Sequence, residues 1–140
     1  GWCLKLSSLT LGSNTKSIAS NTFIACDSLC ALTILSTDCE IYDDANTLPE
    51  NTTIICYENS TADLYAKKYE RKVLYIKIGD VDLDSNVSVM DATTIQRHLA
   101  QTAPISDDQM RLADVDKDND VSVMDATKIQ RFVAQIIPEL

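Results

Sequence analysis

The sequence lacks any apolar run long enough to cross a bilayer, and Gly1-Trp2-Cys3-Leu4 has neither the basic region nor the cleavage pattern of a signal peptide. We therefore expect no membrane insertion. Basic residues are scarce: 12 Lys and Arg stand against 21 Asp and Glu, a net charge of −9. Because such a surface repels polyanions, nucleic acid and anionic lipid are not expected partners.

Catalytic patterns are also missing. No nucleophile–base set, phosphate-binding loop or separated acid pair remains once the acidic loops described below are assigned to a metal. The single histidine, His98, has no second soft ligand nearby in the sequence. We predict that the chain is not an enzyme. The five cysteines have no metal-ligand spacing, and we interpret them as small buried residues: Cys3, Cys26, Cys30, Cys39 and Cys56.

What the sequence does contain is a near duplication. Residues 80–101 return, shifted by 34 positions, as residues 114–135, and 16 of the 22 positions are identical. The acid is concentrated here, since residues 80–140 hold 12 Asp or Glu against 5 Lys or Arg. A duplicated acidic site is more typical of a binding module than of a catalyst.

Each copy places carboxylates at the first, third, fifth and twelfth positions of a loop. This spacing lets a 12-residue loop wrap a calcium ion, with a carbonyl at the seventh position and a water-bridged side chain at the ninth. A solvated acidic loop without an ion is the alternative, which two copies in register make less attractive. We predict two Ca²⁺ ions, with these ligands: Asp80, Asp82, Asp84, Asn86, Ser88 and Asp91 in the first loop, and Asp114, Asp116, Asp118, Asp120, Ser122 and Asp125 in the second.

The loops depart from the usual pattern at two positions. The sixth, normally Gly because φ is positive there, is Ser85 in one loop and Asn119 in the other. Asn tolerates this conformation better than Ser, so we expect the first loop to be the weaker site. The twelfth residue is Asp instead of the longer Glu. Because the clustered carboxylates repel one another, we expect residues 80–140 to fold on calcium binding.

Helices are expected after each loop, at residues 90–101 and 124–137, with a shorter one at 107–112 behind the cap Ser106. The apolar face of the longer helices predicts these core residues: Ala92, Ile95, Leu99, Ile129, Val133 and Ile136. The first loop has no entering helix, since the β-prone segment 73–78 precedes it.

The first half has a weaker period of 23 residues. The pattern C-x-x-L-x-x-L-x-L begins at Cys3 and again at Cys26. Such a period is typical of a leucine-rich repeat, in which the short strand of one coil pairs with that of the next. Two coils bury too little core by themselves, and we infer that further coils precede Gly1. A third strand is expected at 53–57 and a terminal helix at 61–69.

Residues 57–69, with this period, resemble the end of a BspA-like leucine-rich repeat array of the extracellular bacterial type. The resemblance implies a truncated solenoid over residues 1–72 whose ligand is an unknown protein or surface, although a plain packing scaffold fits as well. Residues 73–78 are expected to be a connector, with a final strand as the alternative.

The duplication over residues 79–140 resembles a type I dockerin, as the openings at Gly79 and Ala113 and the repeated Val-Met-Asp-Ala-Thr show. The resemblance implies an α+β chain in which the repeat fragment is followed by an all-α dockerin with two calcium loop–helix motifs. It also implies a cohesin partner on a scaffoldin of an extracellular cellulosome, serving polysaccharide degradation. Carried over to this chain, the partner-binding residues are Val89, Met90, Arg97, His98, Gln101, Val123, Met124, Arg131, Phe132 and Gln135.

Three functions fit these observations. The leading interpretation is a secreted, calcium-dependent docking module that carries a leucine-rich repeat and, because its two copies are nearly alike, binds cohesin in two orientations. The second is a cell-surface recognition protein whose repeat binds the partner while the calcium loops only stabilise the fold. The third is a calcium buffer or sensor.

Overall fold

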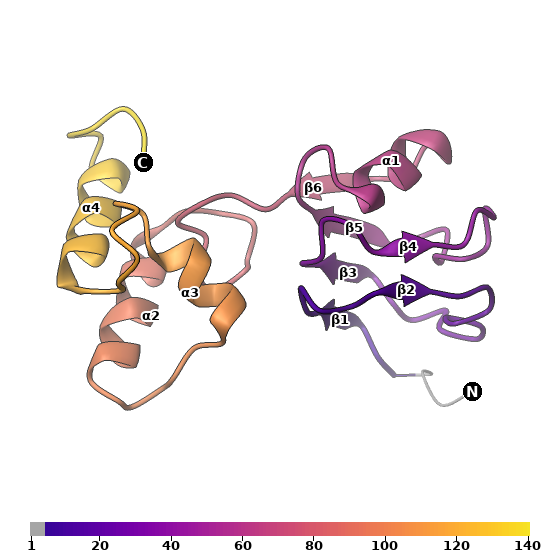
Figure 1. Ribbon diagram of the computed structural model, residues 1–140, viewed down its shortest axis with the longest axis horizontal. Coiled ribbons are helices and arrows are strands. Elements are labelled where there is room, and N and C mark those ends of the chain that lie inside the picture. The colour runs from indigo at the N-terminus through magenta and orange to yellow at the C-terminus, as the bar shows by residue number, and fades with distance from the viewer. Residues whose placement is uncertain (1–4) are drawn as a thin grey trace. The chain divides into compact units, whose positions relative to one another are not determined.

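The structure is a computed structural model that describes residues 5–140, and Cys3 therefore lies outside the described residues. The chain divides into two compact units, one ending at Tyr75 and the other beginning at Ile76 (Figure 1). Each unit has its own hydrophobic core. Within the described part of the chain, no helix combines the length and apolar character needed to cross a bilayer.

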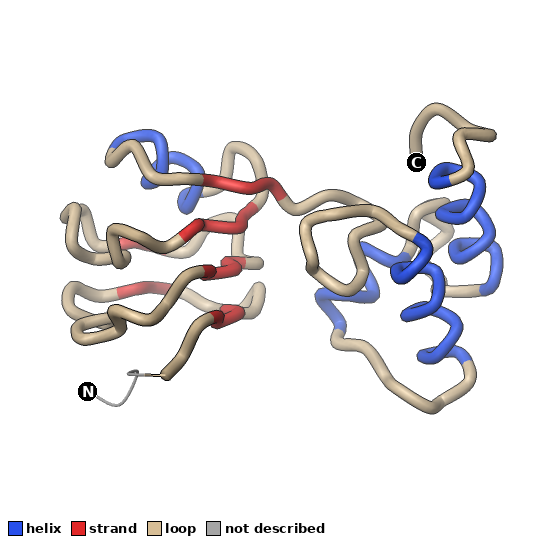
Figure 2. The backbone as a smooth tube through the Cα atoms, turned by 180° about the vertical axis from the view of Figure 1, so that it is seen from behind, coloured by secondary structure: helices blue, strands red, loops and turns tan. Residues whose placement is uncertain are grey.

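The first unit is built on a parallel sheet of four short strands, β1 (Ser8–Leu11), β3 (Ala31–Ile34), β5 (Thr53–Cys56) and β6 (Val73–Tyr75), in that order (Figure 2). Leu9 lies opposite Leu32 and Leu11 opposite Ile34. The paired residues are 23 positions apart, which is the period found in the sequence. The predicted pairing of one coil's strand with the next is therefore confirmed. The smaller strands β2 (Ser17–Ile18) and β4 (Glu40–Ile41) pair in the same way.

Inward-facing residues of successive coils stack into the core of the first unit. Leu32, Ile34 and Ile54 are fully buried. Alternate side chains of a strand point to the same face of the sheet, and these three point to the inner face. Cys26, Cys39 and Cys56 belong to the same core, which confirms the buried-thiol prediction for these three. Cys30 is exposed, so the prediction is wrong for this residue.

Helix α1 (Thr61–Lys68) begins where the sequence predicts. The Ser60 side chain accepts a hydrogen bond from the Asp63 amide, which caps the first turn. Tyr65 fastens the helix to the turn between β4 and β5, because its hydroxyl donates to the Asp44 carbonyl and accepts from the Leu48 amide. One face of the helix is thereby buried against the last coil, while Leu64 stays exposed.

Residues 73–75 form strand β6, which pairs with β5. Of the segment 73–78 predicted as a connector, the first three residues are therefore part of the sheet of the first unit. The alternative of a final strand describes them correctly.

The second unit contains α2 (Val89–Leu99), α3 (Asp107–Ala113) and α4 (Val123–Val133). Helices α2 and α4 pack against each other, and their equivalent residues Ile95 and Ile129 are both fully buried. Val81 and Val115, from the two acidic loops, complete this core. Each half of the duplication thus supplies the same side chains to a shared interior.

The two long helices end earlier than predicted, at Leu99 and Val133 instead of residues 101 and 137. Gln101 and Gln135 have φ of 59° and 62°. The amide of the residue that follows each of them donates a hydrogen bond back into the helix, from Thr102 to the Arg97 carbonyl and from Ile136 to the Arg131 carbonyl. This is the left-handed end usually made by Gly, and no Gly marked it in the sequence.

The early helix ends also change which residues are buried. Leu99, Val133 and Ile136 were predicted in the core, and all three are exposed, Ile136 to 70%. Ile136 lies beyond the helix, so the helical periodicity that predicted its burial does not apply to it.

Candidate metal centres and flanking helices

The first acidic loop brings four carboxylates together. Oxygens of Asp80, Asp82, Asp84 and Asp91 all lie within 4.8 Å of one another. The second loop groups Asp114, Asp116 and Asp125 by the same measure, and Asp118 is not part of that group. Residues far apart in each loop therefore meet at one point, as the predicted spacing requires.

The first carboxylate of each loop organises the turn around it. Asp80 Oδ1 accepts a hydrogen bond from the Asp84 amide at 3.1 Å, and Oδ2 accepts one from the Ser85 amide at 3.0 Å. Asp114 makes the same two bonds to the amides of Asp118 and Asn119 at the same lengths. The backbone is thereby wrapped so that later side chains return toward the first.

The twelfth residue closes the loop from inside the following helix. Asp91 is fully buried, and its Oδ1 accepts from the amides of Val81 at 2.7 Å and Asp82 at 3.1 Å, while Oδ2 accepts from Ser88 at 2.7 Å. Asp125 repeats this pattern in the second loop. The shorter acid is accommodated because it stands in the first turn of the helix, where it completes a capping box.

Besides Asp118, four of the proposed ligands lie outside these acid groups. The hydroxyls of Ser88 and Ser122 are the N-caps of α2 and α4, where each accepts from the amide two residues on at 3.2 Å. Asn86 and Asp120 donate their amides to the preceding carboxylates, Asp84 and Asp118. The ninth position therefore has a structural role that the spacing argument did not anticipate.

Left-handed backbone occurs twice in each loop. Ser85 and Asn119, at the sixth position, have φ of 73° and 67°, as expected. Leu83 and Lys117, at the fourth position, have φ of 61° and 60°, which the sequence analysis missed. A β-carbon in this region is strained, so four such residues point to an imposed loop geometry.

Electrostatics in the first loop reflect this crowding. Burial, followed by repulsion from Asp91, raises the pKa of Asp80 to about 7 and that of Asp82 to about 6. Burial also raises the pKa of Asp116 in the second loop. The carboxylates of each loop repel one another when all are ionised. A hard divalent cation, which binds oxygen donors, would relieve this repulsion.

The first turns of α2 and α4 expose apolar side chains immediately after the loops. Val89 and Met90 are 56% and 48% exposed, and Val123 and Met124 are 60% and 59% exposed. The two valines therefore lie on the surface and are not part of the core. Arg97 and Arg131 are exposed further along the same helices.

Three of the other predicted contact residues shape the backbone. His98 Nδ1 accepts a hydrogen bond from the Ile105 amide at 3.2 Å, which holds the loop after α2. Gln101 and Gln135 occupy the left-handed helix ends. Phe132, at the place of His98 in the second copy, is half-buried and makes the two helices unequal at this point.

Comparison with known proteins finds matches in the second unit. The family model described as the type I dockerin domain matches residues 78–134. A solved type I cohesin–dockerin complex from Clostridium thermocellum contains a chain with 29% sequence identity, and the match covers 46% of this chain and 94% of that one, with a TM-score of 0.43. No curated protein matches the chain.

Proposed function

We propose that this chain is a calcium-dependent docking protein whose second unit binds a cohesin domain on a scaffoldin. One observation carries the proposal: within a segment that matches the type I dockerin domain, each acidic loop is followed at once by an exposed Val-Met pair on a helix. Exposed apolar residues together with arginines are the composition of interface centres, and Arg97 and Arg131 are exposed on the same two helices.

We infer one Ca²⁺ ion for each loop, held by the twelve residues that the spacing predicts. Calcium supplies the positive charge that the grouped carboxylates lack. In each loop the same residues support the first turn of the helix, since Asp91 and Asp125 accept loop amides from a helical position. Ordering the loop therefore orders the Val-Met pair, which makes partner binding calcium-dependent.

The proposed contact surface exists in two copies. Val89, Met90 and Arg97 form one, and Val123, Met124 and Arg131 form the other, with Phe132 replacing His98 and a Gln at each helix end. Because the two helices share a core through equivalent residues, we infer an approximate half-turn that exchanges them. We propose two cohesin-binding orientations that are close in affinity but not identical.

The first unit is proposed to be the cargo. Its parallel strands at a 23-residue period, and the helix packed on the last coil, support a leucine-rich repeat fragment of the BspA-like type. Attachment through the second unit would place it on an extracellular cellulosome. We infer a binding role without catalysis for the chain, because its clustered acids are engaged in the loops.

Pull-down of the full chain by a panel of type I cohesins, with calcium or with excess chelator, tests the proposal. We expect at least one cohesin to capture the protein in calcium only. A double variant, Asp80→Asn with Asp114→Asn, should lose capture, whereas Leu64→Ala, which trims an exposed residue of α1, should keep it. Capture that survives chelation, or no capture by any cohesin, would contradict the assignment.

A further inference from the structure

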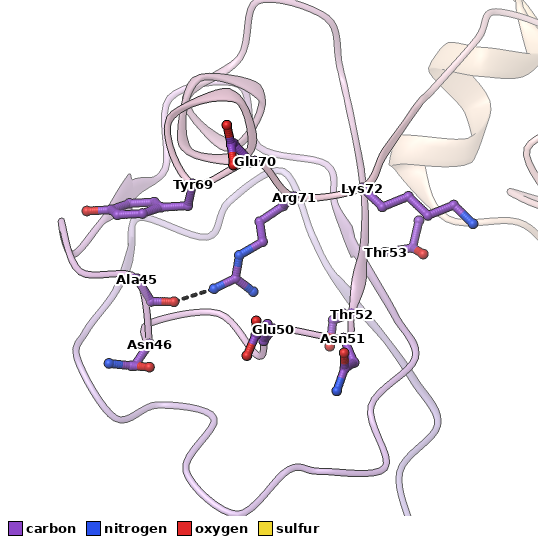
Figure 3. A pocket seen from close by; sticks show the side chains of 10 residues that line it. All are labelled: Ala45, Asn46, Glu50, Asn51, Thr52, Thr53, Tyr69, Glu70, Arg71 and Lys72. Atoms are coloured by element: carbon purple, nitrogen blue, oxygen red, sulfur yellow. Dashed lines mark hydrogen bonds between the residues drawn. The ribbon is translucent and has the colours of Figure 1, made fainter.

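A polar cavity of about 650 Å³ lies in the first unit. Its walls come from two segments, the turn between β4 and β5 and the turn between α1 and β6 (Figure 3). Both segments belong to the first unit, so the cavity needs no residue of the acidic loops. Its size is in the range of sites for small organic ligands, about 300–1,000 Å³.

Arg71 gives the cavity its chemistry. The side chain points into the space between the two turns, where Nη2 donates to the Ala45 carbonyl (Figure 3). Nη1 is buried without a hydrogen-bond partner, and among residues 5–140 no other buried side-chain nitrogen or oxygen lacks one. An unpaired buried N–H is unfavourable, and a guanidinium pairs best with a carboxylate. The cavity is therefore prepared for a ligand that brings an acidic oxygen.

The remaining walls restrict the class of ligand. Lys72 adds a second positive charge, while Glu50 and Glu70 add two carboxylates, so the lining is balanced in formal charge. A polyanion would meet as much repulsion as attraction. Carboxylates, together with the amide of Asn51, are instead suitable partners for hydroxyl groups.

Apart from Ala45 and Tyr69, the residues that line the cavity are all polar or charged. Peptide ligands usually rely on a pocket for an apolar side chain or on a free strand edge, and neither is offered by these two turns. We propose that the cavity binds an acidic sugar, with its carboxylate on Arg71 and its hydroxyls on Glu50, Glu70 and Asn51. This site is independent of the proposed cohesin binding.

Calorimetric titration of the full chain in calcium with galacturonate, which carries a single carboxylate, and with the matched neutral sugar galactose tests this site. We expect binding of the acidic sugar only. Arg71→Gln should weaken it about ten- to a hundredfold, the effect of losing one charge-assisted hydrogen bond. Lys16→Gln makes the same charge change on the exposed surface of the same unit and should have no effect.

Because Arg71→Gln also removes the bond to Ala45, its melting temperature should be measured beside its affinity. Asn51→Ala, at an exposed residue of the wall, provides the second variant and should weaken acidic-sugar binding even if the arginine variant unfolds. Equal affinity for galactose, absence of binding at millimolar galacturonate, or tighter binding of a tripeptide with a free carboxylate would each overturn the assignment. Cohesin capture by Arg71→Gln should be unchanged, which separates this proposal from the docking function.

Discussion

Leu140 packs over Gly79, so the last residue of the sequence closes against the residue that precedes the first acidic loop. A β-carbon added to Gly79 would collide with the Leu140 side chain and crowd Val87. Gly79 also has φ of 89°, in the region that disfavours other residues, and its amide donates to the Leu112 carbonyl at 2.9 Å. The two ends of the second unit are thus held together around one glycine.

Replacing that glycine should destabilise the second unit. Gly79→Ala combines an unfavourable φ with overpacking against Leu140, and we expect a loss of about 1–3 kcal/mol in free energy of unfolding. Denaturant unfolding in calcium measures it. Gly12→Ala, at an exposed glycine without positive φ, is the control. Matching midpoints for the two variants would show that Leu140 does not pack here in solution.

Relieving the sixth loop position should strengthen the first calcium site. Ser85 has φ of 73°, and Ser85→Gly removes a left-handed cost of about 1 kcal/mol, which corresponds to about fivefold in affinity. Asn119→Gly should give a smaller gain, because Asn adopts this conformation more readily. Calorimetric calcium titration compares them. A larger gain for Asn119→Gly would reverse the predicted ranking of the two sites.

Charge reversal at the equivalent arginines tests the two orientations. Arg97→Asp should block one helix and Arg131→Asp the other, so each single variant should keep cohesin affinity within about a factor of ten. The double variant should lose binding. If one single variant abolishes binding and the other has no effect, the chain uses one orientation only. Circular dichroism in calcium checks that the exposed substitutions leave the helices intact.

Calcium-free stability should fall as pH rises between about 4 and 7. Burial and the charges of Asp91, Asp84 and Asp82 raise the pKa of Asp80 to about 7, whereas the unfolded chain loses this proton near 3.8. The folded form therefore binds more protons in this window, and ionisation opposes folding. Calcium removes the proton, so its affinity should increase over the same range.

The helical circular dichroism signal in chelator, which reports how much of the second unit is folded, and calcium titration, each at pH 5 and pH 7.5, measure the two effects. Asp80→Asn cannot ionise and should have the flatter stability profile. Calcium-free protein that becomes more stable at the higher pH would contradict the raised pKa of Asp80 as the controlling feature.

The buried carboxylate of Asp63 should stabilise the first unit. It accepts from the Asn59 amide at 2.8 Å, from Lys67 Nζ at 3.0 Å and from the Tyr75 hydroxyl at 3.0 Å, so it joins α1 to β6. Burial raises its pKa, but these hydrogen bonds outweigh that effect and leave the pKa below its usual value. Asp63→Asn should lower the free energy of unfolding by about 1–3 kcal/mol. Asp43→Asn, which breaks an exposed pair with Lys68, should change it little.

Repeats were the most informative part of the sequence. The 23-residue period predicted that Leu9 would face Leu32, and the 34-residue period predicted two grouped sets of carboxylates, because identical local sequences adopt the same turns and present the same side chains. The left-handed backbone at Ser85 and Asn119 followed from the loop position alone.

Predictions based on periodicity became wrong at the ends of elements. Ile136 continues the apolar spacing of α4 but lies beyond the helix, since Gln135 turns left-handed without the Gly that usually signals it. His98 stays a predicted partner contact, but its ring also accepts a hydrogen bond from the Ile105 amide seven residues away, which the sequence did not indicate. Neither event has a local signature, because each depends on where the returning chain lies.

The amino-acid order by itself determined the repeated coils, the doubled acidic loops and the Val-Met pairs that follow them, since these depend on local spacing and on side-chain chemistry. Tertiary structure alone decided the closure of Leu140 over Gly79, the assignment of β6 to the first unit and the placement of Arg71 in its cavity. These features join residues distant in the chain, and their energies come from packing and desolvation, which exist only once the chain has folded.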